Sequence, residues 1–188
     1  MYTTWFNIIS IFATLSLSAG FFNVGILKYE NEKDKFLSAV QGLSTISTVV
    51  VIAICYVFYS WFYKITGLNK ILLLVMSMQL LFSTPILYWS AKERFEYKYV
   101  KVVCATMFSS IATVAVSLLL IYYMKDKSYS LIIGAAIIQI VIGIGFYIYN
   151  LGKGKKFFDK EIWKYGVSFG IPLIPHYLAY SILNTSDR

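Results

Sequence analysis

Charged residues are absent from most of this 188-residue chain. Asp, Glu, Lys and Arg make up 14% of it, whereas 59% of the residues are hydrophobic. About 20 apolar residues suffice to cross a bilayer, and a charge at the bilayer centre costs about 3 kcal/mol. Six uncharged stretches are long enough to be membrane spans: 2–27, 36–63, 71–91, 102–124, 128–152 and 165–186. The sequence therefore predicts an all-α membrane protein with six transmembrane helices in a single domain, residues 1–188.

Residues suited to catalysis or metal binding are equally scarce. The chain has one histidine, His176, and two cysteines, Cys55 and Cys104, without the spacing of a metal site. No acidic residue lies inside a predicted span, and there is no Gly-rich phosphate loop or nucleophile elbow. We therefore expect no enzyme activity, no metal site and no cofactor. Coupling to Na⁺ or H⁺ stays open.

The charges that are present gather in the connections between the spans. The first, third and fifth connections, 28–35, 92–101 and 153–164, hold 12 of the 17 basic residues, and the second and fourth hold four. The positive-inside rule predicts that these three basic connections are cytoplasmic and that the chain begins outside. An outside start would follow if an earlier span were missing. The net charge of +8 then indicates a lipid bilayer as partner rather than a nucleic acid, because no basic stripe or nucleic-acid motif accompanies it.

All three prolines lie inside apolar stretches. Pro85 falls in 71–91, and Pro172 and Pro175 fall in 165–186. Proline lacks the N–H that would bond to the carbonyl four residues earlier, so that carbonyl needs a neighbouring helix, a hydroxyl or water. We expect helix bends at these three positions, in helices that pack in a bundle or border a wet cavity.

The last stretch carries polar residues at helical spacing. One helix face would contain Pro172, His176, Tyr180, Asn184 and Asp187, at steps of four, four, four and three. This face is our candidate for the lining of a substrate pathway. The alternative is that these side chains bond to neighbouring helices, as polar groups in membrane bundles often do. His176 lies near mid-membrane, where it is either neutral and hydrogen-bonded or in contact with a ligand.

The same stretch resembles the polysaccharide and oligosaccharide flippases of the MOP exporter superfamily. In that family a G-x-P-x-x-P-H motif begins the seventh span and an Asp-Arg pair closes it. The matching residues here are Gly170, Pro172, Pro175 and His176, followed by Asp187-Arg188. The layout from the basic connection 92–101 to 153–164 is also similar. By this resemblance the chain holds the second to seventh spans, most of the N-terminal lobe, and lacks the second lobe.

The resemblance implies a function. Such flippases move polyprenyl-diphosphate-linked oligosaccharide repeat units across the bacterial cytoplasmic membrane for O-antigen, capsule or exopolysaccharide, by alternating access of two lobes. A polysaccharide polymerase and other assembly proteins would be partners. Arg188 and Lys28 are the candidates for a cationic lining that offsets the diphosphate charge. The alternatives are another MOP-superfamily antiporter, or a six-span membrane scaffold that assists polysaccharide assembly.

Overall fold

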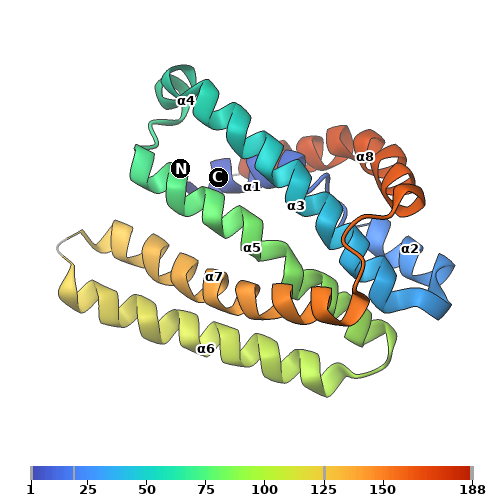
Figure 1. Cartoon of the computed structure of the whole chain (residues 1–188). Coiled ribbons are helices and arrows are strands. Elements are labelled where there is room, and N and C mark those ends of the chain that lie inside the picture. Colours follow the sequence, from blue (N-terminus) through green and yellow to red (C-terminus); the bar gives the residue numbers. More distant parts are fainter. Residues whose placement is uncertain (1, 19, 125, 187–188) are drawn as a thin grey trace.

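The computed structural model describes residues 2–18, 20–124 and 126–186, and this part of the chain is helical, without a strand (Figure 1). The all-α class is confirmed. The elements, including one 3₁₀ turn at Glu30–Glu32, are α1 (Tyr2–Ala13), α2 (Phe21–Lys28), α3 (Lys33–Val57), α4 (Tyr59–Thr66), α5 (Lys70–Phe95), α6 (Tyr99–Tyr123), α7 (Lys127–Gly154) and α8 (Lys160–Ser186).

Five of these helical segments, rather than six, are long and apolar enough to cross a membrane. They are Glu30–Val57, Lys70–Phe95, Tyr99–Tyr123, Tyr129–Gly154 and Lys160–Leu183. The chain is thus a multi-pass membrane protein, but the predicted first span, 2–27, is two short helices, α1 and α2. Leu15 and Ser16 both have φ of 50°. That conformation cannot continue a right-handed helix, so the first apolar run is interrupted.

The predicted second span is also divided. α3 begins at Lys33, within the charged connection, and ends at Val57, and the short α4 follows Phe58. The left-handed Gly67, with φ of 66°, then ends α4. Helical hydrogen bonding continues through polar residues at a membrane surface, so helix ends do not coincide with the ends of uncharged stretches. For the same reason α5 extends to Phe95.

α3 lies between two groups of helices. On one side it packs against α5 and α7, and α7 packs closely along α6; on the other side it contacts α1 and α8 (Figure 1). The aromatic core around α2 and α3 includes Phe21, Phe22 and Phe36, and the Phe22 and Tyr88 rings lie 5.2 Å apart. Gly143 lets α7 approach α5 so closely that a Cβ there would overlap the carbonyl oxygen of Phe82.

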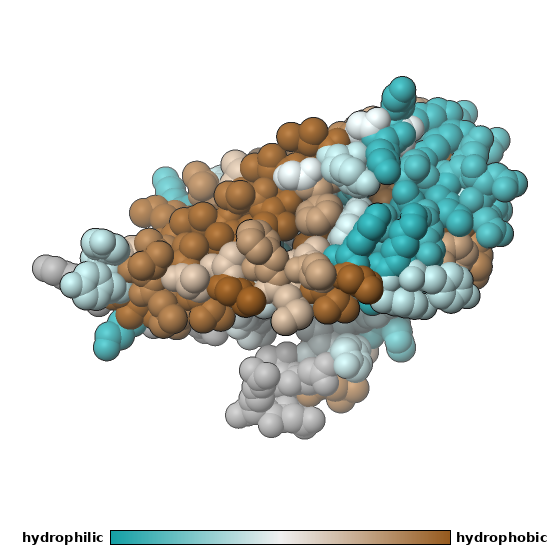
Figure 2. All heavy atoms as spheres, turned by 90° about the horizontal axis from the view of Figure 1, so that it is seen from below, coloured by the Kyte–Doolittle hydropathy of each residue, from teal (hydrophilic) through white to brown (hydrophobic). Residues whose placement is uncertain are grey.

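The three basic connections, 28–35, 92–101 and 153–164, lie together at one end of the molecule, here called the basic end (Figure 1). Ion pairs join them: Lys92 pairs with Asp34, and Lys35 Nζ lies 3.9 Å from Asp159. In Figure 2 apolar side chains cover most of the visible face, and hydrophilic residues gather at one end. Such an apolar surface fits lipid contact. That the basic end faces the cytoplasm stays a prediction.

Candidate functional site

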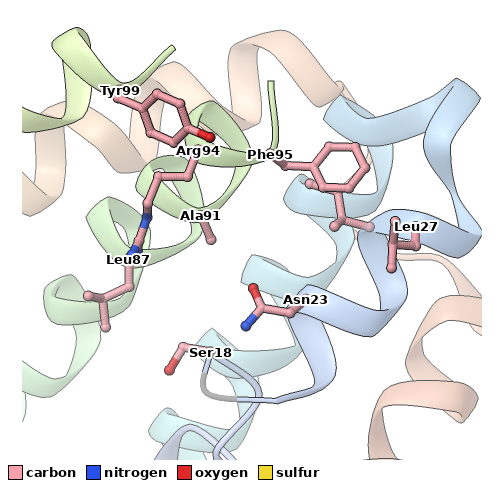
Figure 3. Close-up of a pocket in the computed structure, with 9 residues that line it drawn as sticks. Ser18, Asn23, Leu27, Leu87, Ala91, Arg94, Phe95 and Tyr99 are labelled. Atoms are coloured by element: carbon pink, nitrogen blue, oxygen red, sulfur yellow. The ribbon is translucent and has the colours of Figure 1, made fainter. Parts of the chain in front are cut away.

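A pocket of about 580 Å³ lies between α2, α5 and the start of α6 (Figure 3). Its polar lining is Ser18, Asn23, Arg94 and Tyr99, and the rest is mostly apolar. The pocket exists beside the interruption of the first apolar run. There the chain turns before α2 begins at Phe21, and Ser18 belongs to this turn. If the run 2–27 were one unbroken helix, Ser18 and the residues of α2 would lie at other positions along α5.

Three consecutive residues near the end of α5 face three different neighbours. Lys92 is buried and pairs with Asp34 of α3. Glu93 is also buried, and its Oε2 lies 3.9 Å from Lys101 Nζ of α6. Arg94 lines the pocket beside α2. Successive helical residues are about 100° apart, so these three charged side chains point in different directions around α5.

Arg94 has hydrogen-bond donors to spare. Its Nε donates to the Ser90 carbonyl oxygen (3.2 Å) and its Nη2 to Ser90 Oγ (3.3 Å). These bonds turn the guanidinium back along α5, towards the level of Leu87 (Figure 3). A guanidinium has five N–H donors, so three have no partner among the described residues after these two bonds. In the part of the chain that the structure describes, Arg94 forms no ion pair.

Glu96, two residues after Arg94 in sequence, is engaged elsewhere. Lys98 donates a hydrogen bond to Glu96 (2.5 Å), and this bond holds the pKa of Glu96 below its ordinary value. Lys92 Nζ is a second cation near the Glu96 carboxylate, at 3.8 Å. Glu96 is therefore ionised at neutral pH but balanced by lysines. The positive charge of Arg94 stays available to a ligand.

This arrangement suits a phosphate-containing ligand. Guanidinium N–H groups match phosphate oxygens in geometry and charge, and Asn23 and Ser18 lie across the pocket from Arg94 (Figure 3). An amide and a hydroxyl can bond to sugar hydroxyls. The volume falls within the range of ordinary ligand pockets, and Leu27, Leu87 and Phe95 give it an apolar wall.

The predicted cationic residue Lys28 lies at the basic end but does not line this pocket. It ends α2, is exposed, and places its Nζ 4.3 Å from the centre of the Tyr165 ring. His176 is 11 residues further along α8 than Tyr165, about 16 Å at the helical rise of 1.5 Å per residue. The structure therefore does not bring Lys28 and His176 together.

Pro172, His176 and Tyr180 are exposed on α8, which packs against α1, α2 and α3. Tyr180 is 62% exposed, and the His176 ring contacts Tyr177 of its own helix, 5.6 Å away. Asn184 lies in α8, but its side chain is outside the described part, as are Asp187 and Arg188 altogether. The pathway role of this face stays a prediction.

The three prolines lie within continuous helices. α5 runs through Pro85, and α8 runs through Pro172 and Pro175. Asn150 Nδ2 donates to the Pro85 carbonyl oxygen (3.1 Å) and to Gln41 Oε1 (2.8 Å), which ties α7 to α5 and α3. This buried bridge braces α5 beside its proline. The bending role of the three prolines stays a prediction.

Arg94 was missed because charge counting assigned it to a connection. A usable signal was present: the chain has 15 lysines and only two arginines, of which Arg94 is one. Arginine recognises phosphate in a way that lysine does not reproduce. Among the described residues no group of three His, Cys, Asp or Glu side chains could hold a metal ion.

Comparisons with known proteins identify the family. The model of a family described as "Polysaccharide biosynthesis protein" matches residues 1–188. The chain therefore belongs to this family, that of the MOP-type polysaccharide flippases. Searches of curated proteins and of solved structures gave no match.

Proposed function

We propose that this member of the polysaccharide biosynthesis family takes part in moving polyprenyl-diphosphate-linked oligosaccharide repeat units across the cytoplasmic membrane, by alternating access. Surface polysaccharide would be built from the exported units. The observation that carries this proposal is the Arg94 pocket at the basic end. Sugars and diphosphates cannot cross hydrocarbon unaided, so a transporter must offer polar and cationic groups within a membrane-spanning bundle.

Different residues of the pocket lining would hold different parts of the substrate. The three remaining N–H groups of Arg94 bind diphosphate oxygens, and Asn23 and Ser18 bond to the first sugar. Leu87 and Phe95 contact the first units of the polyprenyl chain. With the basic end at the cytoplasmic face, the pocket lies on the side where the lipid-linked unit is assembled, and its charge attracts the anionic head.

Release on the opposite side requires the pocket walls to separate. The interruption between α1 and α2 provides a hinge, because the left-handed residues Leu15 and Ser16 connect two short helices. Hinges in transporters are commonly a few residues that absorb a backbone change. Movement of α2 away from α5 would remove Asn23 and Ser18 from Arg94 and weaken the hold on the substrate.

Export in cells tests this function. Arg94→Gln removes the cation and leaves a shorter, neutral polar side chain, so we expect at least a tenfold loss of surface polysaccharide in a strain that depends on this protein. Arg94→Lys keeps the charge but not the planar donors, so part of the export should return. Polysaccharide extracted from the cell surface is measured, and immunoblots of membranes check protein levels.

Lys98→Gln is the matched control. Lys98 lies in the same connection and loses the same charge, but its partner is Glu96 and it does not line the pocket. Export should be unchanged in this variant. Wild-type export by Arg94→Gln, at an equal membrane level, would overturn the assignment of the pocket.

A further inference from the structure

A second hollow lies on the opposite side of α5, bounded by α5, α6 and α7. Its volume is about 520 Å³, and it is an open groove with mainly apolar walls, including Trp89, Phe108, Ile142 and Phe146. The Trp89 and Phe146 rings lie 4.6 Å apart across the contact between α5 and α7. We call it the α6 groove. Nothing in the proposed transport function requires it.

One end of the α6 groove is charged. Glu93 is 5% exposed, and its Oε2 is buried without a hydrogen bond in the described part of the chain. The nearest cation, Lys101 Nζ, is 3.9 Å away, beyond hydrogen-bond distance, and the Lys101 side chain is 65% exposed. A buried carboxylate oxygen without a hydrogen-bond donor is energetically costly. A ligand that supplies a donor at this end of the groove would remove that cost.

The groove has a direction relative to the membrane. Along α6, Ala105 and Phe108 follow Lys101 away from the basic end, and along α5 Trp89 lies one turn inward from Glu93. From Lys101 to Phe108 the groove extends about 10 Å at the helical rise. The charged end therefore lies where lipid head groups would be, and the apolar part lies at the depth of acyl chains.

Gly145 gives the groove its width on the α7 side. A Cβ built at Gly145 would meet no atom within 4 Å, in contrast to Gly143 two residues earlier. The space beside Gly145 is open rather than filled by a neighbouring helix. A side chain at this position would therefore begin in the open space of the groove.

We propose that the α6 groove binds one phospholipid whose head group carries a primary ammonium, of the phosphatidylethanolamine type. The ammonium donates to Glu93 Oε2, the lipid phosphate pairs with Lys101, and an acyl chain lies against Trp89 and Phe146. This zwitterion matches the Glu93–Lys101 pair in sign and order. A choline head group has no N–H to donate, and an anionic head group brings no cation to Glu93.

Lipid retention by the purified full-length protein tests the proposal. The protein is delipidated, mixed with equal amounts of phosphatidylethanolamine, phosphatidylcholine and phosphatidylglycerol with the same acyl chains, and examined by native mass spectrometry. Wild type should retain about tenfold more phosphatidylethanolamine than phosphatidylcholine, the effect expected of a charge-assisted hydrogen bond. Glu93→Gln should lose this preference. Equal retention of the two lipids by wild type would overturn the proposal.

Gly145→Leu tests the acyl part of the groove. It should reduce retention of phosphatidylethanolamine severalfold with the head-group contacts intact. Gly152→Leu is the control, because Gly152 is also on α7, also has no atom within 4 Å of a built Cβ, and does not line the groove. Light scattering is measured in parallel. A change of oligomeric state in Gly145→Leu with unaltered lipid retention would show that the groove docks a second copy, and would refute lipid binding.

Discussion

The two hollows on either side of α5 differ in the charge that lines them, although Arg94 and Glu93 lie at nearly the same level of the helix. On the α2 side an interrupted helix leaves a pocket in which Arg94 has donors to spare. On the α6 side three continuous helices leave a groove in which Glu93 has an acceptor to spare. The residues are neighbours in sequence, yet we propose an anionic ligand on one side and an ammonium group on the other. The helix face, rather than the local net charge, therefore distinguishes the two proposed sites.

The way each hollow is built differs as well. The pocket depends on backbone irregularity at Leu15 and Ser16, and a transporter can use such irregularity for movement. The groove depends on the missing side chain of Gly145, which faces open space between continuous helices. We therefore associate the α2 side with transport and the α6 side with a fixed lipid.

The largest loss of stability is expected at Gly143, where α7 packs directly against α5. Gly143→Ala would place a Cβ on the Phe82 carbonyl oxygen, so α5 and α7 must separate, at a cost of about 1–3 kcal/mol. Gly145→Ala faces open space and should be neutral or slightly stabilising, because alanine favours helix. Thermal midpoints in detergent compare the two. Equal midpoints would mean that α7 is not held against α5 at Gly143.

Neutralising each side of α5 separately should give opposite results. Arg94→Gln should lower polysaccharide export at least tenfold and leave lipid retention unchanged. Glu93→Gln should leave export unchanged and abolish the preference for phosphatidylethanolamine. Both readouts are taken on both variants, with membrane levels equalised. If Glu93→Gln lowers export as strongly as Arg94→Gln, the carboxylate serves transport, which would favour a cation-coupled antiporter.

The helices on the α6 side follow from the sequence more directly than those on the α2 side. The uncharged runs 102–124 and 128–152 correspond closely to α6 and α7. The run 2–27 looks equally continuous, but Leu15 and Ser16 adopt positive φ without a glycine or proline at either position. The break depends on tertiary packing, which cannot be predicted from a pattern of composition.

The site was harder to predict than the helices, for a related reason. Counting charges by connection treats Lys92, Glu93 and Arg94 alike, whereas α5 continues to Phe95 and turns each of them towards a different helix. The partner of Lys92 is Asp34, 58 residues away. Pairing over that distance depends on the packing of α3 against α5. Local periodicity predicts only which residues share a face within one helix, as it does for His176 and Tyr180 on α8.

Lys92 holds α5 to α3 between the two hollows, so removing its partner should disturb both sides moderately. Lys92 is 6% exposed, and Asp34→Asn would leave its charge buried with Glu96, at 3.8 Å, as the remaining acidic neighbour in the described ranges. We expect a loss of about 1–2 kcal/mol, less than for a buried pair with no second acid. Glu32→Gln, which breaks the exposed pair with Lys35, should cost close to nothing. Denaturation in detergent distinguishes the two variants.

The smallest effect concerns the connection from α7, on the groove side, to α8. Asp159 accepts hydrogen bonds from Lys156 and from the backbone N–H of Ile162, and these hold its pKa below the ordinary value of 3.8. The stabilisation is thus complete above pH 3.8 and is lost as the pH falls through the lower folded pKa. Asp159→Asn keeps the bond to Ile162 and removes the charge. Its thermal midpoint should lie slightly below that of wild type at pH 7, corresponding to a loss of less than about 1 kcal/mol in the free energy of unfolding, and the two midpoints should converge at acid pH. A difference that persists below pH 3 would mean that the cap geometry, rather than the carboxylate charge, holds α8 to the basic end.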